Sequence, residues 1–148
     1  MSDRATSAFT ALIVDDEQLA ADELAYLLKD FPDIDVVGTA KNGIQAVKMI
    51  EELEPELVFL DVQMPGLDGL GVIRTLQEKK VPLPYFILAT AYEQYAVEAF
   101  RLEALDYVLK PVEKSRLALT VDRARRMLQE KSAKAAAEAI VAELDWKE

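Results

Sequence analysis

Short, largely apolar runs alternate along this chain with longer segments in which apolar residues recur every three or four positions. A buried strand produces the first pattern, and one face of a helix produces the second. Five runs are expected to be strands, at about 9–14, 36–39, 57–60, 85–89 and 107–109. Helical spacing follows the first run, at Leu24, Leu27, Leu28 and Phe31. Because Pro32 restricts the residue before it, we expect the first helix to end there.

The same spacing predicts the remaining helices. Asn42 is the expected N-cap of the second helix, because its side chain can accept a hydrogen bond from the first turn. The pair Glu54-Pro55 should end that helix. Apolar residues mark three helices: Val47, Ile50 and Leu53 on the buried face of the second, Leu70, Ile73 and Leu76 in the third, and Tyr95, Ala96, Ala99 and Phe100 in the fourth. From about Glu113 the pattern is helical to near the end.

Strict alternation of strand and helix predicts an α/β fold with a doubly wound, five-stranded parallel sheet and helices on both faces. Five-stranded sheets of this kind often have the strand order 2-1-3-4-5. In that order the first and third strands are neighbours, and their helices leave on opposite faces. The crevice beyond the carboxyl ends of these two strands is then the expected ligand site.

The last helix is expected to extend beyond the domain. Up to Gln129 its apolar positions suit packing on the sheet: Leu117, Val121, Ala124 and Leu128. Farther on, the alanine-rich stretch 133–137 forms a helix readily but offers little apolar face. We expect residues 1–8 to be disordered, 9–129 to form one domain, and 130–148 to form a helical linker or short coiled coil. We favour a fragment of a longer protein with a missing effector, and a stand-alone domain is the alternative.

Charged residues follow three of the strands. Asp15 and Asp16 end the first strand, Asp61 ends the third, and Lys110 ends the fifth. If these strands are neighbours in a parallel sheet, the four side chains converge at one point. Clustered carboxylates require a divalent cation, and a lysine beside them favours an anion. The pattern therefore predicts a site for Mg²⁺ and a phosphoryl group.

Composition limits the possible functions. The 148 residues are enough for one domain, and the formal net charge is −10. Such an acidic chain repels nucleic-acid phosphates, so we do not expect it to bind DNA by itself. It has no cysteine, which excludes thiolate zinc sites, and no histidine, which excludes Ser-His and Cys-His triads. No apolar run approaches the ~20 residues of a membrane span, so we expect no membrane association.

Four motifs resemble the receiver domain of bacterial two-component response regulators over roughly 10–129. The motifs are Ile13-Val14-Asp15-Asp16-Glu17, Asp61-Val62-Gln63-Met64-Pro65, Ala89-Thr90-Ala91 and Tyr107-Val108-Leu109-Lys110-Pro111. The resemblance implies a flavodoxin-like receiver fold and a cytoplasmic switch that is not a turnover enzyme. Segments 90–100 and 104–107 further resemble the LytR/AlgR branch, whose effector is a LytTR DNA-binding domain. Gln18 and Ala21 depart from the usual proline and arginine of that branch.

Chemistry and resemblance together suggest a role for each site residue. Asp61 is the expected phosphoacceptor, which attacks the phosphohistidine of a sensor kinase and needs Mg²⁺ to offset charge repulsion. The expected metal ligands are Asp15, Asp16, Asp61 and the backbone carbonyl of Gln63. Lys110 and Thr90 should contact phosphoryl oxygens. The resemblance also implies a cis peptide bond between Lys110 and Pro111.

Switching and lifetime involve residues around this site. Phosphorylation is expected to draw Thr90 toward the phosphoryl group and to turn Tyr107 into the space it leaves. Gln63 and Tyr92 should flank the path of the water that hydrolyses the phosphoryl group. Phe100 is a candidate for an interface through which the activated chain forms a homodimer. In a longer protein, a LytTR domain would then bind paired DNA half-sites.

Other interpretations remain open from the sequence. Asp15 and Asp16 could cap a helix, and Asp61 could cap the next turn. A phosphatase of the haloacid-dehalogenase type also uses an aspartate nucleophile with Mg²⁺, but it needs a second acid where this chain has Gln63. A binding module that never accepts phosphate is a third possibility, although the full set of site residues argues against it.

Overall fold

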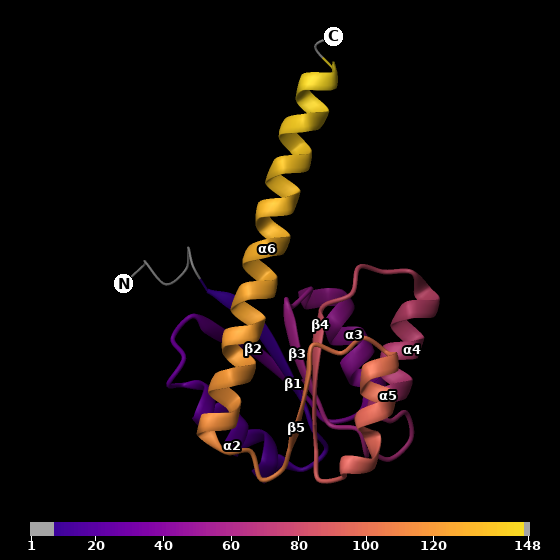
Figure 1. Ribbon diagram of the computed structural model, residues 1–148. Coiled ribbons are helices and arrows are strands. Elements are labelled where there is room, and N and C mark those ends of the chain that lie inside the picture. The colour runs from indigo at the N-terminus through magenta and orange to yellow at the C-terminus, as the bar shows by residue number, and fades with distance from the viewer. Residues whose placement is uncertain (1–7, 147–148) are drawn as a thin grey trace.

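The computed structural model describes residues 8–146, and the expected disorder of residues 1–8 falls almost wholly outside that range. Strands and helices alternate through the described part (Figure 1). The strands are β1 (Phe9–Val14), β2 (Ile34–Ala40), β3 (Leu57–Leu60), β4 (Tyr85–Thr90) and β5 (Asp106–Leu109). The helices are α2 (Gln18–Leu28), α3 (Gly43–Leu53), α4 (Gly69–Lys79), α5 (Ala96–Arg101) and α6 (Lys114–Trp146), with a 3-10 turn, η1 (Glu93–Tyr95), before α5.

The five strands form one parallel sheet in the order β2-β1-β3-β4-β5, which confirms the predicted fold. The register aligns the carboxyl ends of the central strands. Val14 pairs with Leu60, Leu60 pairs with Leu88, and Thr90 pairs with Leu109. The loops that follow β1, β3, β4 and β5 therefore leave the sheet at the same edge.

Helices cover both faces of the sheet, with α2 and α6 on one side and α3, α4 and α5 on the other (Figure 1). Successive strand residues point to opposite faces, so each strand contributes to two cores. In β1, Leu12 and Val14 join the core under α3 and α4, while Ala11 and Ile13 join the core under α2 and α6. Burial on both faces explains why the strands are continuous apolar runs.

Local details agree with the sequence in most places. Asn42 caps α3, since its side chain accepts a hydrogen bond from the Gln45 backbone N–H at 2.8 Å. The assignment of Leu53 to the buried face is wrong, because the side chain is 44% exposed at the last turn of α3. Tyr95 lies in η1 rather than in α5. Phe100 points away from the core and is 83% exposed.

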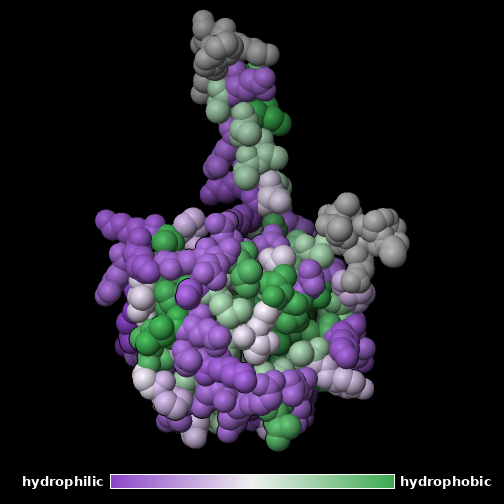
Figure 2. All heavy atoms as spheres, turned by 180° about the vertical axis from the view of Figure 1, so that it is seen from behind, coloured by the Kyte–Doolittle hydropathy of each residue, from purple (hydrophilic) through white to green (hydrophobic). Residues whose placement is uncertain are grey.

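The long C-terminal helix is confirmed. In α6, residues Leu117, Val121, Ala124 and Leu128 pack on the sheet. The ammonium group of Lys131 then lies 5.6 Å from the centre of the Tyr85 ring. Residues 129–144 are exposed, and the far end of α6 projects beyond the domain (Figure 2). Within the described residues, no helix is both long and apolar enough to cross a membrane.

Candidate functional site

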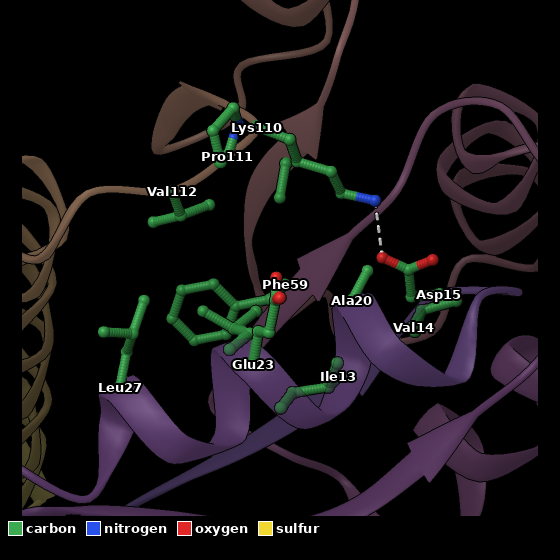
Figure 3. A pocket seen from close by; sticks show the side chains of 12 residues that line it. Ile13, Val14, Asp15, Ala20, Glu23, Leu27, Phe59, Lys110, Pro111 and Val112 are labelled. Carbon is green, nitrogen blue, oxygen red and sulfur yellow. Dashed lines mark hydrogen bonds and ion pairs between the residues drawn. The ribbon is translucent and has the colours of Figure 1, made fainter.

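Two carboxylates and one ammonium group meet where β1, β3 and β5 end. Asp15 and Asp61 are only 5% and 7% exposed. The Lys110 Nζ lies 2.6 Å from Asp15 Oδ2 and 3.4 Å from Asp61 Oδ2. Figure 3 shows Lys110 reaching across the sheet edge to Asp15, beside a pocket lined by apolar side chains of α2 and β3. The predicted convergence of acids and lysine is therefore present in the fold.

Asp16 completes a cluster of three acids. One carboxylate oxygen from each of Asp15, Asp16 and Asp61 lies within 4.8 Å of the others. Hard oxygen ligands at this spacing suit a divalent cation such as Mg²⁺. Asp15 Oδ1 also accepts a hydrogen bond from the Glu17 backbone N–H at 3.0 Å, but Glu17, not an aspartate, occupies the N-cap position of α2. The donor set thus fits a cation better than it fits a helix cap.

Burial and neighbouring charges shift the pKa values of Asp61 and Lys110 in ways that suit different roles. Burial raises the pKa of Asp61 to about 6, against the opposing charge of Lys110 and with added repulsion from Asp15. Burial acts to lower the pKa of Lys110, but its hydrogen bond to Asp15 and the charge of Asp61 raise that pKa above its ordinary value. Lys110 is therefore a fixed positive charge at neutral pH, facing a carboxylate that is costly to keep ionised.

Backbone geometry fixes the lysine and the threonine together. The Lys110 backbone N–H donates to the Thr90 carbonyl at 2.8 Å, as the last bond between β4 and β5. The peptide bond between Lys110 and Pro111 is cis, as the resemblance implied. Thr90 is fully buried, and its Oγ1 accepts a hydrogen bond from the Tyr92 backbone N–H at 3.3 Å. Lys110 and Thr90 therefore stand at the carboxyl ends of β5 and β4, at the same sheet edge as the three aspartates.

Tyr107 is bound to the loop after β4. Its hydroxyl donates to the backbone carbonyl of Tyr92. Burial raises the pKa of Tyr107, and the nearby charge of Glu93 adds to that shift. Tyr92 is 43% exposed and contacts Tyr95 edge to face, with ring centroids 6.3 Å apart. The two expected switch residues, Thr90 and Tyr107, therefore hold the same loop at two points.

Sequence reasoning missed two close contacts of the loop that follows Asp61. The Gln63 side chain donates to the Tyr95 hydroxyl at 2.9 Å, and the spacing of Tyr95 had suggested only a helix. A Cβ on Gly69 would collide with the backbone carbonyl of Asp61, so only glycine fits at the start of α4. Such contacts join residues from separate segments, and no local sequence pattern reveals them.

A partly buried polar cluster behind β5 was also missed. Arg116 of α6 donates to both carboxylate oxygens of Asp106, at 3.0 and 2.9 Å, and to the Tyr107 carbonyl at 3.0 Å. Thr120 is fully buried and donates to Asp106 at 2.6 Å. Arg123 lies 3.7 Å from the same carboxylate. The cluster links α6 to β5, the strand that contains Tyr107 and leads into Lys110.

Comparison with known proteins agrees with this geometry. Residues 11–122 match the family model of the response regulator receiver domain. The chain is 46% identical to an uncharacterized response regulatory protein of Vibrio parahaemolyticus, over 82% of this chain and 49% of that protein. It is 42% identical to the transcriptional regulatory protein BtsR of Salmonella typhi, over 78% of this chain and 47% of that protein. The chain therefore spans about half the length of these curated relatives.

Solved structures show the same fold. The receiver domain of AraT, a response regulator from Geobacillus stearothermophilus, has a TM-score of 0.76 and 30% identity, covering 84% of this chain and 98% of that one. The response regulatory domain of mrkE from Klebsiella pneumoniae has a TM-score of 0.75 and 31% identity, covering 82% and 99%. Both similarities span the sheet and its helices.

Proposed function

This chain belongs to the response regulator receiver family, and from that premise we propose that Asp61 accepts a phosphoryl group from a sensor histidine kinase. Receiver domains are regulatory switches of two-component systems, and histidine kinases phosphorylate them. The observation that carries the proposal is the cluster of Asp15, Asp16 and Asp61 around the Lys110 ammonium group. The family match also favours this function over the haloacid-dehalogenase alternative.

The transfer step follows from the charges at the site. A carboxylate oxygen of Asp61 forms a bond to phosphorus, and the bond from phosphorus to the histidine nitrogen breaks, so the histidine leaves with its electron pair. Lys110 would pair with a phosphoryl oxygen, and Thr90 would donate its hydroxyl to another. Asp15, Asp16, Asp61 and the backbone carbonyl of Gln63 would hold Mg²⁺. When bound, Mg²⁺ offsets the repulsion between the carboxylates and the phosphoryl group.

The response would begin in the loop after β4. If Thr90 turns toward the phosphoryl group, its hydrogen bond from Tyr92 is lost, and space opens beside β5. Tyr107 would then leave the Tyr92 carbonyl and turn into that space, where ring burial favours the new state. Hydrogen exchange should change over residues 90–109 on phosphorylation. A change confined to α2 would contradict this switch.

Intact mass spectrometry tests the phosphoacceptor directly. After treatment with acetyl phosphate and Mg²⁺, the chain should gain one phosphoryl adduct. The adduct should be absent in Asp61→Asn and after chelation of the metal. An equal adduct in Asp61→Asn would exclude Asp61 as the acceptor, and the absence of any adduct in the parent would favour a binding module that never takes phosphate.

We also propose that the activated chain forms a homodimer through the face made by α5, β5 and α6. Large apolar side chains are exposed on both helices of this face: Val97 is 58%, Phe100 is 83% and Leu119 is 64% exposed. The switch residue Tyr107 lies in the strand between them. Sedimentation should show a monomer without beryllofluoride and a dimer with it. A monomer in both conditions at high concentration would favour a stand-alone or intramolecular switch.

The output is proposed to be transcriptional. One relative, BtsR, is named a transcriptional regulatory protein, and the segments 90–100 and 104–107 resemble the LytR/AlgR branch. In a whole protein of about twice this length, α6 would lead from the switch to a LytTR DNA-binding domain. With a net charge of −10, the chain itself would bind DNA only through such a domain. A cytoplasmic location stays a prediction from the family resemblance.

A further inference from the structure

One side-chain hydrogen bond joins the loop after β3 to the turn after β4. Gln63 donates from Nε2 to the Tyr95 hydroxyl at 2.9 Å. Gln63 lies two residues after Asp61, and Tyr95 ends the turn η1 that follows the loop of Thr90. The bond thus connects the segment that carries the proposed phosphoacceptor with the segment proposed to move on activation.

Tyr95 is the fixed partner in this bond. Its ring is half-buried, packs against the core under α3 and α4, and meets Tyr92 edge to face. Gln63, in contrast, is exposed and has three rotatable side-chain bonds. Tyr95 therefore determines where the Gln63 amide lies.

Gln63 and Tyr95 meet at a hollow outside the acidic cluster. That hollow is lined by Gln63 and Tyr95 together with Met64, Pro65 and Asp68. We propose that Tyr95 is a positioning residue that holds the Gln63 amide away from the water attacking phosphorylated Asp61, and so lengthens the lifetime of the phosphoryl group. This inference rests on the proposed phosphorylation of Asp61.

The hydrolysis step shows why the amide matters. A water oxygen forms a bond to phosphorus, the bond between phosphorus and the Asp61 oxygen breaks, and the water proton passes to solvent. Asp61 is recovered as a carboxylate, and inorganic phosphate leaves. An amide near the line of attack can accept a hydrogen bond from that water and hold it in place. When Tyr95 holds the Gln63 amide away from the line of attack, the amide does not accept this hydrogen bond.

The test removes only the Tyr95 hydroxyl. In Tyr95→Phe, purified phosphorylated protein should lose phosphate about threefold faster with Mg²⁺ present, since one exposed hydrogen bond is released. Tyr26→Phe is the matched control, because it removes an exposed hydroxyl on α2 that does not bind Gln63, and its rate should equal that of the parent. In a Gln63→Ala background, Tyr95→Phe should leave the rate unchanged.

A second measurement follows the bond without phosphate. The side-chain amide resonances of Gln63 should shift in Tyr95→Phe and stay in place in Tyr26→Phe. Equal rates in the parent and Tyr95→Phe would overturn the inference while leaving Asp61 as the acceptor. The same acceleration with and without Gln63 would overturn it too, because Tyr95 would then act through the loop. A parent that never gains a phosphoryl adduct would instead refute the proposed function.

Discussion

Asp61→Asn is expected to stabilise the fold at neutral pH, although it should abolish phosphorylation. The Asp61 side chain is 9% exposed and stands among the charges of Asp15, Asp16 and Lys110. Burial raises its pKa from 3.8 to about 6, so the ionised form is less favourable in the folded chain than in the unfolded one. Asparagine has nearly the same shape and carries no charge. The substitution therefore removes the free-energy cost of keeping a buried, ionised carboxylate at the functional site.

The magnitude follows from the size of the pKa shift. The rise from 3.8 to about 6, at ~1.4 kcal/mol for each pKa unit, corresponds to about 3 kcal/mol at neutral pH. Solvent that reaches the open edge of the site reduces this figure, so we expect a gain of about 2 kcal/mol in the free energy of unfolding. Among ordinary substitutions, which mostly destabilise, a gain of this size is readily detected.

The raised pKa of Asp61 also determines how the effect of Asp61→Asn on stability changes with pH. Because the folded pKa of Asp61 is raised, its favourable contribution is complete below about pH 3.8 and is lost as the pH rises through about 6. The difference between Asp61→Asn and the parent should therefore be small near pH 4 and reach its full value above pH 6. Urea denaturation with chelator, from pH 4 to pH 8, measures it. A difference that does not change with pH, or a destabilised variant at pH 7, would refute this reasoning.

Three further predictions concern the surroundings of the site. Thr120→Val should destabilise the fold by about 1–2 kcal/mol in urea denaturation, because the buried carboxylate of Asp106 loses a donor; a cost near zero would count against a structural role for the cluster. Burial acts to raise the pKa of Asp106, but hydrogen bonds from Arg116 and Thr120 hold that pKa below its ordinary value. The stability that this group contributes should therefore be present above about pH 4 and lost as the pH falls further. In Asp106→Asn, the free energy of unfolding should fall less steeply below that pH. Tyr92→Ala should speed loss of phosphate from Asp61, up to about tenfold or ~1.4 kcal/mol, because it removes a ring that crowds the attacking water; an unchanged half-life would show that Tyr92 does not shield the site.

Much of the fold was predictable because it depends on short-range patterns. Buried strands must be apolar on both faces, so the run from Leu57 to Leu60 predicted β3 without error. The parallel order then placed the ends of β1 and β3 side by side, so the amino-acid sequence alone was enough to bring Asp15 and Asp61 together. The sequence predicts such sites well when each functional residue stands at the end of a strand.

The parts that were missed depend on contacts between distant segments. Leu53 is apolar and correctly spaced, yet it lies at the last turn of α3 and stays half-exposed. The bond between Gln63 and Tyr95 depends on how two loops meet, and the cluster of Asp106 and Arg116 depends on where α6 crosses β5. Helical spacing identifies the elements but not these tertiary pairs. Polar side chains that pair across elements are therefore the hardest features to predict from one sequence.

The measurement that tests the central claim most directly locates the phosphoryl group on the chain. Borohydride reduces an aspartyl phosphate to homoserine, so the modified position can be identified in peptides by mass spectrometry. After phosphorylation with Mg²⁺ and reduction, homoserine should appear at position 61, and no conversion should appear at Asp15 or Asp16. Homoserine at either of those neighbours, with Asp61 unchanged, would contradict the account.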